Sequence, residues 1–190
     1  MLVLIIAISG ASGAGKTTLQ TRLLDHLMGG RVISNTTRTR RESDTANEYR
    51  FLNRSDFLGI DDWLWMEEIH GNLYGTRKSD VDVVLRHKGI ASIIVVHQCH
   101  PILKKAYDNS EVEVLCLHLL SPDEKRIRER LVQRGDALPN IERRLIDCRD
   151  WDTEVRTLQF VHLVQAESQE AVFQQCLRLV LDQVLSKRPG

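Results

Sequence analysis

The sequence predicts an α/β fold with a parallel sheet at its core. An apolar run at 2–8 leads directly into a glycine-rich turn and a leucine-rich amphipathic segment, as a strand followed by a helix would. Further apolar runs alternate with helical patterns, at 90–96, 112–120 and 160–165. This alternation is typical of βαβ units. The polar segment 35–78 breaks the alternation, so we expect it to form a small inserted domain.

The elements of the first half follow from the spacing of apolar residues. The run at 2–8 fits a buried parallel strand rather than a secretory leader, because it lacks a basic start and continues into glycines. Residues 17–28 are predicted to form a helix, since their leucines share one face and Gly29 and Gly30 follow as a stop. A short strand is expected at 31–34, and two more lie inside the insertion, at 49–52 and 63–69.

The second half is predicted to place long helices between its strands. One helix is expected to start near Ser79. The sequence Ser121-Pro122-Asp123-Glu124 is typical of another helix start, with an N-cap, a proline in the first turn and a glutamate at the third position. That helix runs to about 133, and helices at 140–158 and 168–185 follow. The irregular piece at 134–140 joins two charged helices and is expected to form a lid.

Length and composition limit the classes of protein. The chain has 190 residues, enough for one good core but not for two full-sized domains. Lys and Arg number 26, as do Asp and Glu, so no overall field favours nucleic acid or an anionic membrane. No apolar run approaches the roughly 20 residues of a membrane span. The four cysteines lie far apart without a Cys-x-x-Cys pair, which indicates reduced thiols and a cytoplasmic location.

The glycine-rich turn matches the P-loop pattern G-x-x-x-x-G-K-[ST] at every required position, from residue 10 to residue 17. Glycines let consecutive backbone N–H groups face phosphate oxygens, and the following helix points its positive end at the same place. Lys16 would supply a charge at the β- and γ-phosphates, and the Thr17 hydroxyl would reach Mg²⁺. We therefore expect an ATP site made of Gly10, Ser12, Gly13, Ala14, Gly15, Lys16, Thr17 and Thr18.

Six segments carry a pattern wider than the P-loop. They are Ser-Gly-Ala-Ser-Gly-Ala-Gly-Lys-Thr-Thr-Leu at 9–19, Ser-Asn-Thr-Thr-Arg-Thr-Arg-Arg at 34–41, Glu-Tyr-Arg-Phe at 48–51, Gly-Asn-Leu-Tyr-Gly-Thr at 71–76, Arg-Leu-Val-Gln-Arg-Gly at 130–135 and Ile-Glu-Arg-Arg-Leu at 141–145. In order and spacing the chain resembles the guanylate kinases, within the nucleoside monophosphate kinases. The resemblance implies a three-layer sandwich with a P-loop core at 1–34 and 79–190, whose lid lies near 134–140. It also implies that the insertion at 35–78 binds the acceptor phosphate.

The resemblance implies acceptor-binding roles inside this insertion. Arg38 and Arg41 would hold the acceptor phosphate together with Tyr49 and Tyr74. Guanidinium forks bind phosphate through two hydrogen bonds, and phenol hydroxyls add further donors. A solvated basic turn and tyrosines packed in a small sheet are the structural alternatives. The acceptor site is further expected to include Ser34, Glu67 and Thr76.

The resemblance also implies a catalytic group of cations. Arg134 and Arg144 match lid arginines that would act with Lys16 on the phosphoryl group in transfer, where negative charge spreads over the equatorial oxygens. The neighbouring arginines share their helices with acidic residues, so ion pairs three or four residues apart explain most of them. Gln165 falls where the family has an asparagine near the adenine.

The chain departs from the family at the positions that read the base. Trp65 stands where an acidic residue would read the guanine edge, with Glu67 and Glu68 nearby. An Asp-x-Asp pair at a strand end is replaced by Val95 and His97. Asp44 stands at the position of a phosphate-loop glutamate. His97, Cys99 and His100 have no recognised metal-ligand spacing and are expected to fill a turn.

The sequence therefore predicts a nucleoside monophosphate kinase that uses ATP and Mg²⁺. It would move the γ-phosphoryl group to the phosphate of a small-molecule acceptor, first of all GMP or dGMP. Three other interpretations stay open. Glu67 or Glu68 reads guanine in a shifted register, the acceptor is ribose bisphosphate or an unusual nucleotide, or the chain is a guanylate-kinase-like module that binds protein. The intact P-loop speaks against the module.

Overall fold

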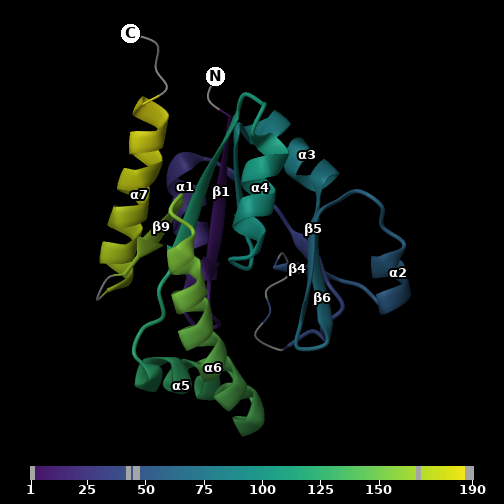
Figure 1. Cartoon of the computed structure of the whole chain (residues 1–190), viewed down its shortest axis with the longest axis vertical. Helices are drawn as coiled ribbons and strands as arrows, with labels where there is room; N and C mark the ends of the chain where they lie inside the picture. Colours follow the sequence, from purple (N-terminus) through teal and green to yellow (C-terminus); the bar gives the residue numbers. More distant parts are fainter. Residues whose placement is uncertain (1–2, 42–43, 45–47, 166–167, 187–190) are drawn as a thin grey trace.

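The centre of the protein is a five-stranded parallel sheet (Figure 1). The structure is a computed structural model that describes residues 3–41, 44, 48–165 and 168–186. The strand order is β2 (Gly30–Arg31), β7 (Ile90–Ile94), β1 (Val3–Gly10), β8 (Val112–Leu119) and β9 (Val161–Val164). β1 pairs in parallel with β7 on one side and with β8 on the other. The prediction of an α/β fold on a parallel sheet is confirmed.

Helices cover both faces of this sheet, which gives three layers (Figure 1). Leu4, Ile6 and Ile8 of β1 pack with α1 (Lys16–Leu27) and α7 (Gln169–Leu185). Ile5 and Ala7 point to the other face and pack with α3 (Lys78–Lys88) and α4 (Cys99–Tyr107). Because both faces of the strand are buried, β1 is apolar throughout instead of alternating. No helix among the described residues is long and apolar enough to cross a membrane.

A second sheet of four strands stands beside the core (Figure 1). Its order is β4 (Tyr49–Phe51), β3 (Ser34–Thr36), β6 (Asn72–Arg77) and β5 (Trp63–Ile69). The expected single strand at 31–34 is wrong. Arg31 ends a strand of the main sheet and Ser34 begins one of the second sheet, because the chain passes from one sheet to the other between them.

The two tryptophans of β5 pack in different places. A register shift between Trp63 and Trp65 means that they do not share one face, contrary to simple alternation. Trp63 stacks on Phe57 of the short helix α2 (Arg54–Leu58), with ring centroids 4.3 Å apart. Trp65 joins the core next to α3 and α4. Trp63 also explains Gly75 on the neighbouring strand, since a Cβ there would lie 2.9 Å from ring carbons of Trp63.

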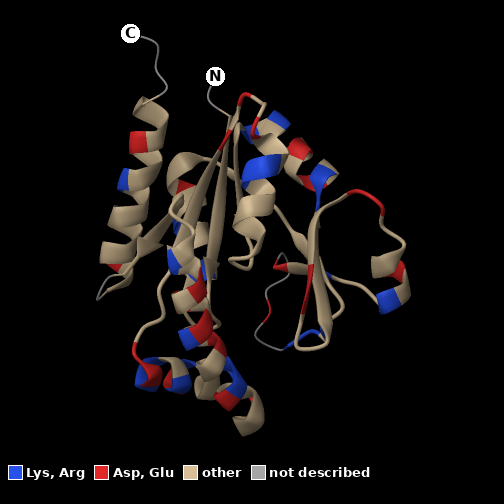
Figure 2. Ribbon diagram, viewed as in Figure 1, with Lys and Arg blue, Asp and Glu red and all other residues tan. Residues whose placement is uncertain are grey.

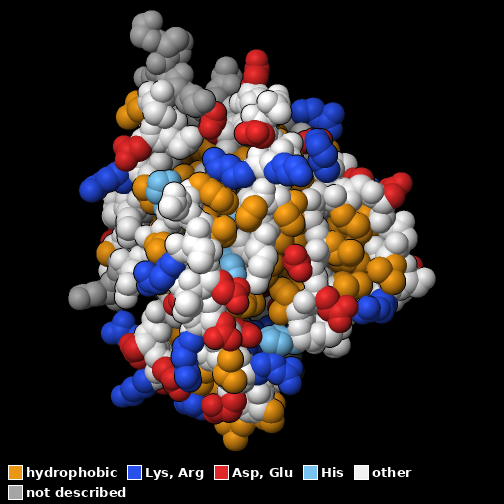
Figure 3. Space-filling model, viewed as in Figure 1, with side chains coloured by type: hydrophobic (Ala, Val, Ile, Leu, Met, Phe, Trp, Pro, Cys, Tyr) orange, Lys and Arg blue, Asp and Glu red, His pale blue; other side chains and the backbone are white. Residues whose placement is uncertain are grey.

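Two helices project from one end of the core, and residues 134–137 connect them (Figure 1). They are α5 (Glu124–Gln133) and α6 (Leu138–Glu154), and they share a small core with Ala11 of the P-loop. Side chains of both charges crowd these helices and mix over their surface (Figures 2 and 3). Asp123, not Ser121, caps α5 by accepting the Arg126 N–H at 2.9 Å. Ser121 lies three residues before the first helical residue, Glu124, so it is too far from the helix start to cap it.

The hydrophobic pattern of the sequence did not indicate three elements, which are α2, β6 and α4. His97, Cys99 and His100 were expected to fill a turn, but Cys99 and His100 are the first two residues of α4. After α6 a short 3-10 turn, η1 (Val155–Thr157), leads toward β9.

Candidate active site

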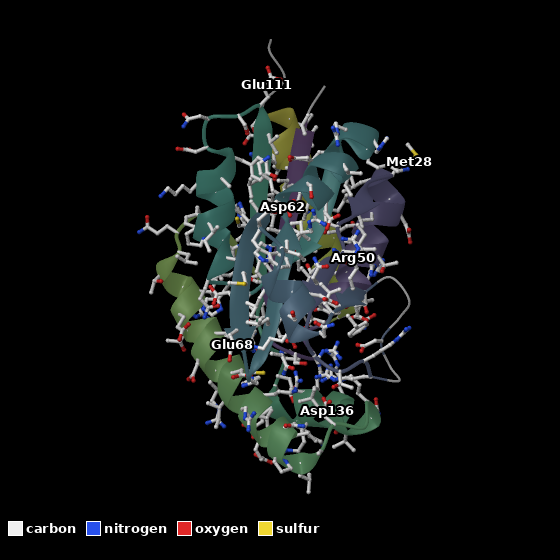
Figure 4. All side chains as sticks on the ribbon, turned by 90° about the vertical axis from the view of Figure 1, so that its right-hand side faces the viewer. Met28, Arg50, Asp62, Glu68, Glu111 and Asp136 are labelled. Atoms are coloured by element: carbon white, nitrogen blue, oxygen red, sulfur yellow. The ribbon has the colours of Figure 1, made fainter. Side chains whose placement is uncertain are left out.

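A cavity of about 570 Å³ opens where three parts of the chain meet. One wall is the P-loop, the second is the inserted sheet, and the third is formed by α5, α6 and the residues between them. Figure 4 views the molecule from the side of the inserted sheet, with Asp136, between α5 and α6, labelled below it. The predicted residues that line the cavity are Gly10, Ser12, Gly13, Gly15, Lys16, Thr17, Thr18, Arg38, Arg41, Tyr49, Tyr74, Arg134 and Arg144.

The P-loop has the backbone that its glycines allow. Gly10, Gly13 and Gly15 all have φ between 86° and 139°, which side chains other than glycine rarely adopt. At Gly10 a Cβ would also lie 2.6 Å from the Leu119 carbonyl oxygen. Lys16 begins α1, and its Nζ donates to the carbonyls of Gly10 at 2.7 Å and of Ala11 at 2.9 Å. The ammonium is therefore held across the mouth of the loop.

Arg134, between α5 and α6, reaches the P-loop. Arg134 donates to Ser12 Oγ at 3.1 Å and pairs with Asp136, which also lies 3.9 Å from Arg144 Nε. Burial, and then the charges of Arg134 and Arg144, lower the pKa of Lys16 to about 8. Burial also lowers the pKa of Arg144, and the charges of Arg41 and Arg134 add to it. The cations therefore repel one another across one cavity, so an anion bound between them would be strongly stabilised.

The second sheet and the loop after β3 contribute a second set of polar groups to the cavity. Arg38 forms two hydrogen bonds of 2.9 Å with the carboxylate of Asp44, and the side chains are 9% and 6% exposed. Tyr49 and Tyr74 lie with their rings 6.1 Å apart. Burial raises the pKa of Tyr49 to about 12, so at neutral pH its hydroxyl remains a donor. Arg41 is close enough to Arg134 for that charge to lower its pKa, after burial and Arg38. Arg41 and Arg134 thus lie near each other at the same cavity.

This arrangement agrees with comparisons to known proteins. A sequence model of the family described as guanylate kinase matches residues 3–181. The guanylate kinase of Wolinella succinogenes is 30% identical over 190 residues, covering 97% of this chain and 86% of its own. The chain belongs to the guanylate kinase family. As a member of this family it is a nucleoside monophosphate kinase.

Other family members give the same picture. The guanylate kinase of Clostridium perfringens strain 13 is 35% identical over 142 residues, which covers 71% of this chain and 63% of that one. A crystal structure of guanylate kinase from Anaplasma phagocytophilum matches the whole chain and 87% of its own, with a TM-score of 0.63. Its sequence identity is 15%, so it shows the shared fold.

Three predicted acceptor residues of this family member do not line the cavity. Ser34 and Thr76 are buried and share a hydrogen bond of 2.7 Å. Glu67 faces the start of α4, where burial and then the charge of Glu67 raise the pKa of Cys99 to about 12. Of the replaced positions, Trp65 and Val95 do line the cavity, and Trp65 is 4% exposed. His97 does not line the cavity, and its Nε2 lies 2.7 Å from the Glu154 carboxylate in a hydrogen bond.

Several residues at the cavity were not predicted. Arg130 donates to the Gly13 carbonyl at 2.6 Å, although it was interpreted as a helix surface residue. His70, in the turn between β5 and β6, pairs with Asp147 of α6 at 2.8 Å and so joins the second sheet to α6. Glu48 accepts a hydrogen bond from Thr17. These contacts join residues between 31 and 117 positions apart, so local patterns could not indicate them.

A second cavity, of about 730 Å³, lies on the other side of the P-loop. It shares Gly15, Thr18, Arg130 and Gln169 with the first cavity. Its remaining residues include Ala14, Arg22, Arg126 and Gln165, the last where an adenine contact was expected. The two cavities therefore meet at the P-loop.

A buried chain of polar side chains supports the P-loop from beneath. Ser121 N–H and His118 Nε2 both donate to Asp152, at 2.9 and 3.1 Å. His118 Nδ1 then accepts from the hydroxyl of Ser9, whose oxygen accepts from His100 Nε2, both at 2.7 Å. Burial lowers the pKa of His100 to about 3, with smaller contributions from the other histidines. His100 is therefore neutral, which fits the absence of a partner for its Nδ1 among the described residues.

Proposed function

We propose that the protein transfers the γ-phosphoryl group of Mg·ATP to the phosphate of a nucleoside monophosphate, with GMP or dGMP as the first candidates. The observation that carries this proposal is the convergence of Lys16, Arg41, Arg134 and Arg144 on one cavity that begins at the P-loop. A reaction between two anionic groups needs such a convergence, because it must offset their repulsion and the charge of the transition state. The guanylate kinase names of the relatives support the acceptor.

In this proposal different residues bind the adenosine part of ATP, its phosphates and the acceptor phosphate. The second cavity would hold the adenosine part of ATP, and the P-loop with Lys16 would hold its phosphates. Arg38, Arg41, Tyr49 and Tyr74 would bind the acceptor phosphate. Mg²⁺, when bound near the Thr17 hydroxyl, would neutralise part of the phosphate charge.

Positioning supplies most of the catalysis in this proposal. The acceptor phosphate is already ionised at neutral pH, so no general base is required, and orientation dominates. The contact between His70 and Asp147 joins the two sides of the cavity, and their closure would exclude water that would otherwise consume ATP. The ATP requirement and the four free, buried cysteines support a cytoplasmic location.

A specific observation favours a second candidate acceptor. Five large apolar side chains line the cavity, those of Trp65, Ile69, Val95, Val96 and Trp151. None of these side chains offers a carboxylate to the N–H groups of guanine. A different phosphorylated acceptor, such as a ribose bisphosphate or another nucleotide, is therefore the alternative to GMP.

A coupled assay of ADP release tests both candidates. Mg·ATP would be supplied with purine and pyrimidine monophosphates, their deoxy forms and ribose phosphates in turn. Turnover with GMP or dGMP that is lost in Lys16→Ala supports the first candidate. Turnover with a ribose phosphate alone supports the second. No turnover with any nucleoside monophosphate would refute the nucleotide acceptor.

A further inference from the structure

Glu48 reaches from the inserted domain to the P-loop. It is the residue before β4, and Thr17 Oγ1 donates to its Oε1 at 3.3 Å. Its negative charge raises the pKa of Lys16, against the stronger lowering by burial and by Arg134. Glu48 therefore lies next to both P-loop residues that face the phosphates of a nucleotide.

Three described carboxylates line the cavity, those of Asp44, Glu48 and Asp147. Asp44 is bound by both nitrogens of Arg38 and by the Arg41 N–H at 2.6 Å. Asp147 is bound by His70. Glu48 is the one whose carboxylate contacts the P-loop hydroxyl.

A hydroxyl and a carboxylate in this arrangement fit a magnesium ion. Mg²⁺ takes oxygen ligands at about 2.1 Å in octahedral geometry, so two adjacent ligands lie about 3 Å apart. The 3.3 Å between Thr17 Oγ1 and Glu48 Oε1 is close to that separation. Mg²⁺ also binds proteins through only one or two carboxylates, the other positions being filled by phosphate oxygens and water.

We propose that Glu48 is a ligand of the Mg²⁺ that accompanies ATP, together with the hydroxyl of Thr17. The inference rests on the proposed use of Mg·ATP. It has a structural consequence, because Glu48 adjoins Tyr49 of the acceptor side. The metal ion would join the P-loop to the inserted domain, so loading the donor would help to close the acceptor site.

Calorimetric titration with ATP, with and without Mg²⁺, tests the proposal without turnover. In the unaltered protein Mg²⁺ should tighten ATP binding. In Glu48→Gln this gain should fall about tenfold or more, as when metal-site partners are removed. Binding of metal-free ATP should stay the same or become tighter, since a negative charge near the phosphates is gone. Mn²⁺ titration followed by electron paramagnetic resonance, in the presence of ATP, should show the same loss.

A matched control lies in the same domain. Glu68→Gln removes a carboxylate of β5 that pairs with Arg54, and it should leave the Mg²⁺ dependence unchanged (Figure 4). Thermal unfolding of both variants checks that they fold. An undiminished gain from Mg²⁺ in Glu48→Gln would overturn the proposal, as would equal weakening of ATP binding with and without metal. If Mg²⁺ did not tighten ATP binding in the unaltered protein, the proposed donor would fail and the inference with it.

Discussion

Lys16→Arg should abolish a proton uptake that accompanies Mg·ATP binding in the unaltered protein. Burial and the charges of Arg134 and Arg144 lower the pKa of Lys16 to about 8. The amine is then about one-tenth deprotonated at pH 7 and about half deprotonated at pH 8. Phosphate groups beside it favour the charged form and restore the proton. Binding should therefore take up about 0.1 proton at pH 7 and about 0.5 at pH 8.

Calorimetry in buffers of different ionisation enthalpy measures this uptake directly. The heat of Mg·ATP binding would be compared in HEPES and Tris at pH 7 and pH 8. In Lys16→Arg the guanidinium remains charged at both pH values, so the two buffers should give the same proton count of zero at pH 8. An uptake that does not rise between pH 7 and pH 8 in the unaltered protein would refute the argument without any variant. An uptake that persists in Lys16→Arg would assign it to another group.

Three further predictions concern stability and acceptor binding. The pKa of His100 is about 3 in the folded chain and near 6.5 in the unfolded one, so only the unfolded chain gains its proton below pH 6.5. Urea unfolding should show a loss of about 1.4 kcal/mol for each pH unit below 6.5, smaller in His100→Gln. Gly10→Ala should weaken ATP binding and lower the melting temperature, because its Cβ meets the Leu119 carbonyl at 2.6 Å; an unchanged melting curve would contradict this. Arg38→Lys loses a two-point contact worth about 1.5–3 kcal/mol, so the acceptor KM should rise roughly 10- to 100-fold in steady-state assays while the ATP KM stays the same.

The sequence predicts the parts of this protein that local patterns determine. β1 was predictable because its apolar run is buried on both faces, and the P-loop because its chemistry lies within eight consecutive residues. The second sheet was harder to predict. Gly75 weakened the strand signal of β6, although the approach of Trp63 requires it there.

Some residues of the candidate site could be predicted from the sequence and others could not. The cations at 38, 41, 134 and 144 were assigned through resemblance, and the structure brings them to one cavity. Ser34 and Thr76 were assigned in the same way, yet their hydroxyls bond each other beneath the surface. Glu48 and Arg130 went unrecognised because their contacts with Thr17 and Gly13 exist only after the chain has folded.

The buried chain of polar side chains next to the P-loop makes the stability contributions of its residues depend on one another. His100 donates a hydrogen bond to Ser9, Ser9 donates one to His118, and His118 donates one to Asp152. Replacing one of these residues alone leaves its neighbour buried without a hydrogen-bond partner, which lowers the free energy of unfolding. Exchanging His100, Ser9 and His118 together for apolar side chains of similar volume would leave Asp152 with its hydrogen bond from the Ser121 N–H. We therefore expect single substitutions at these positions to destabilise the fold more than a joint substitution does, although none of these residues faces the nucleotide.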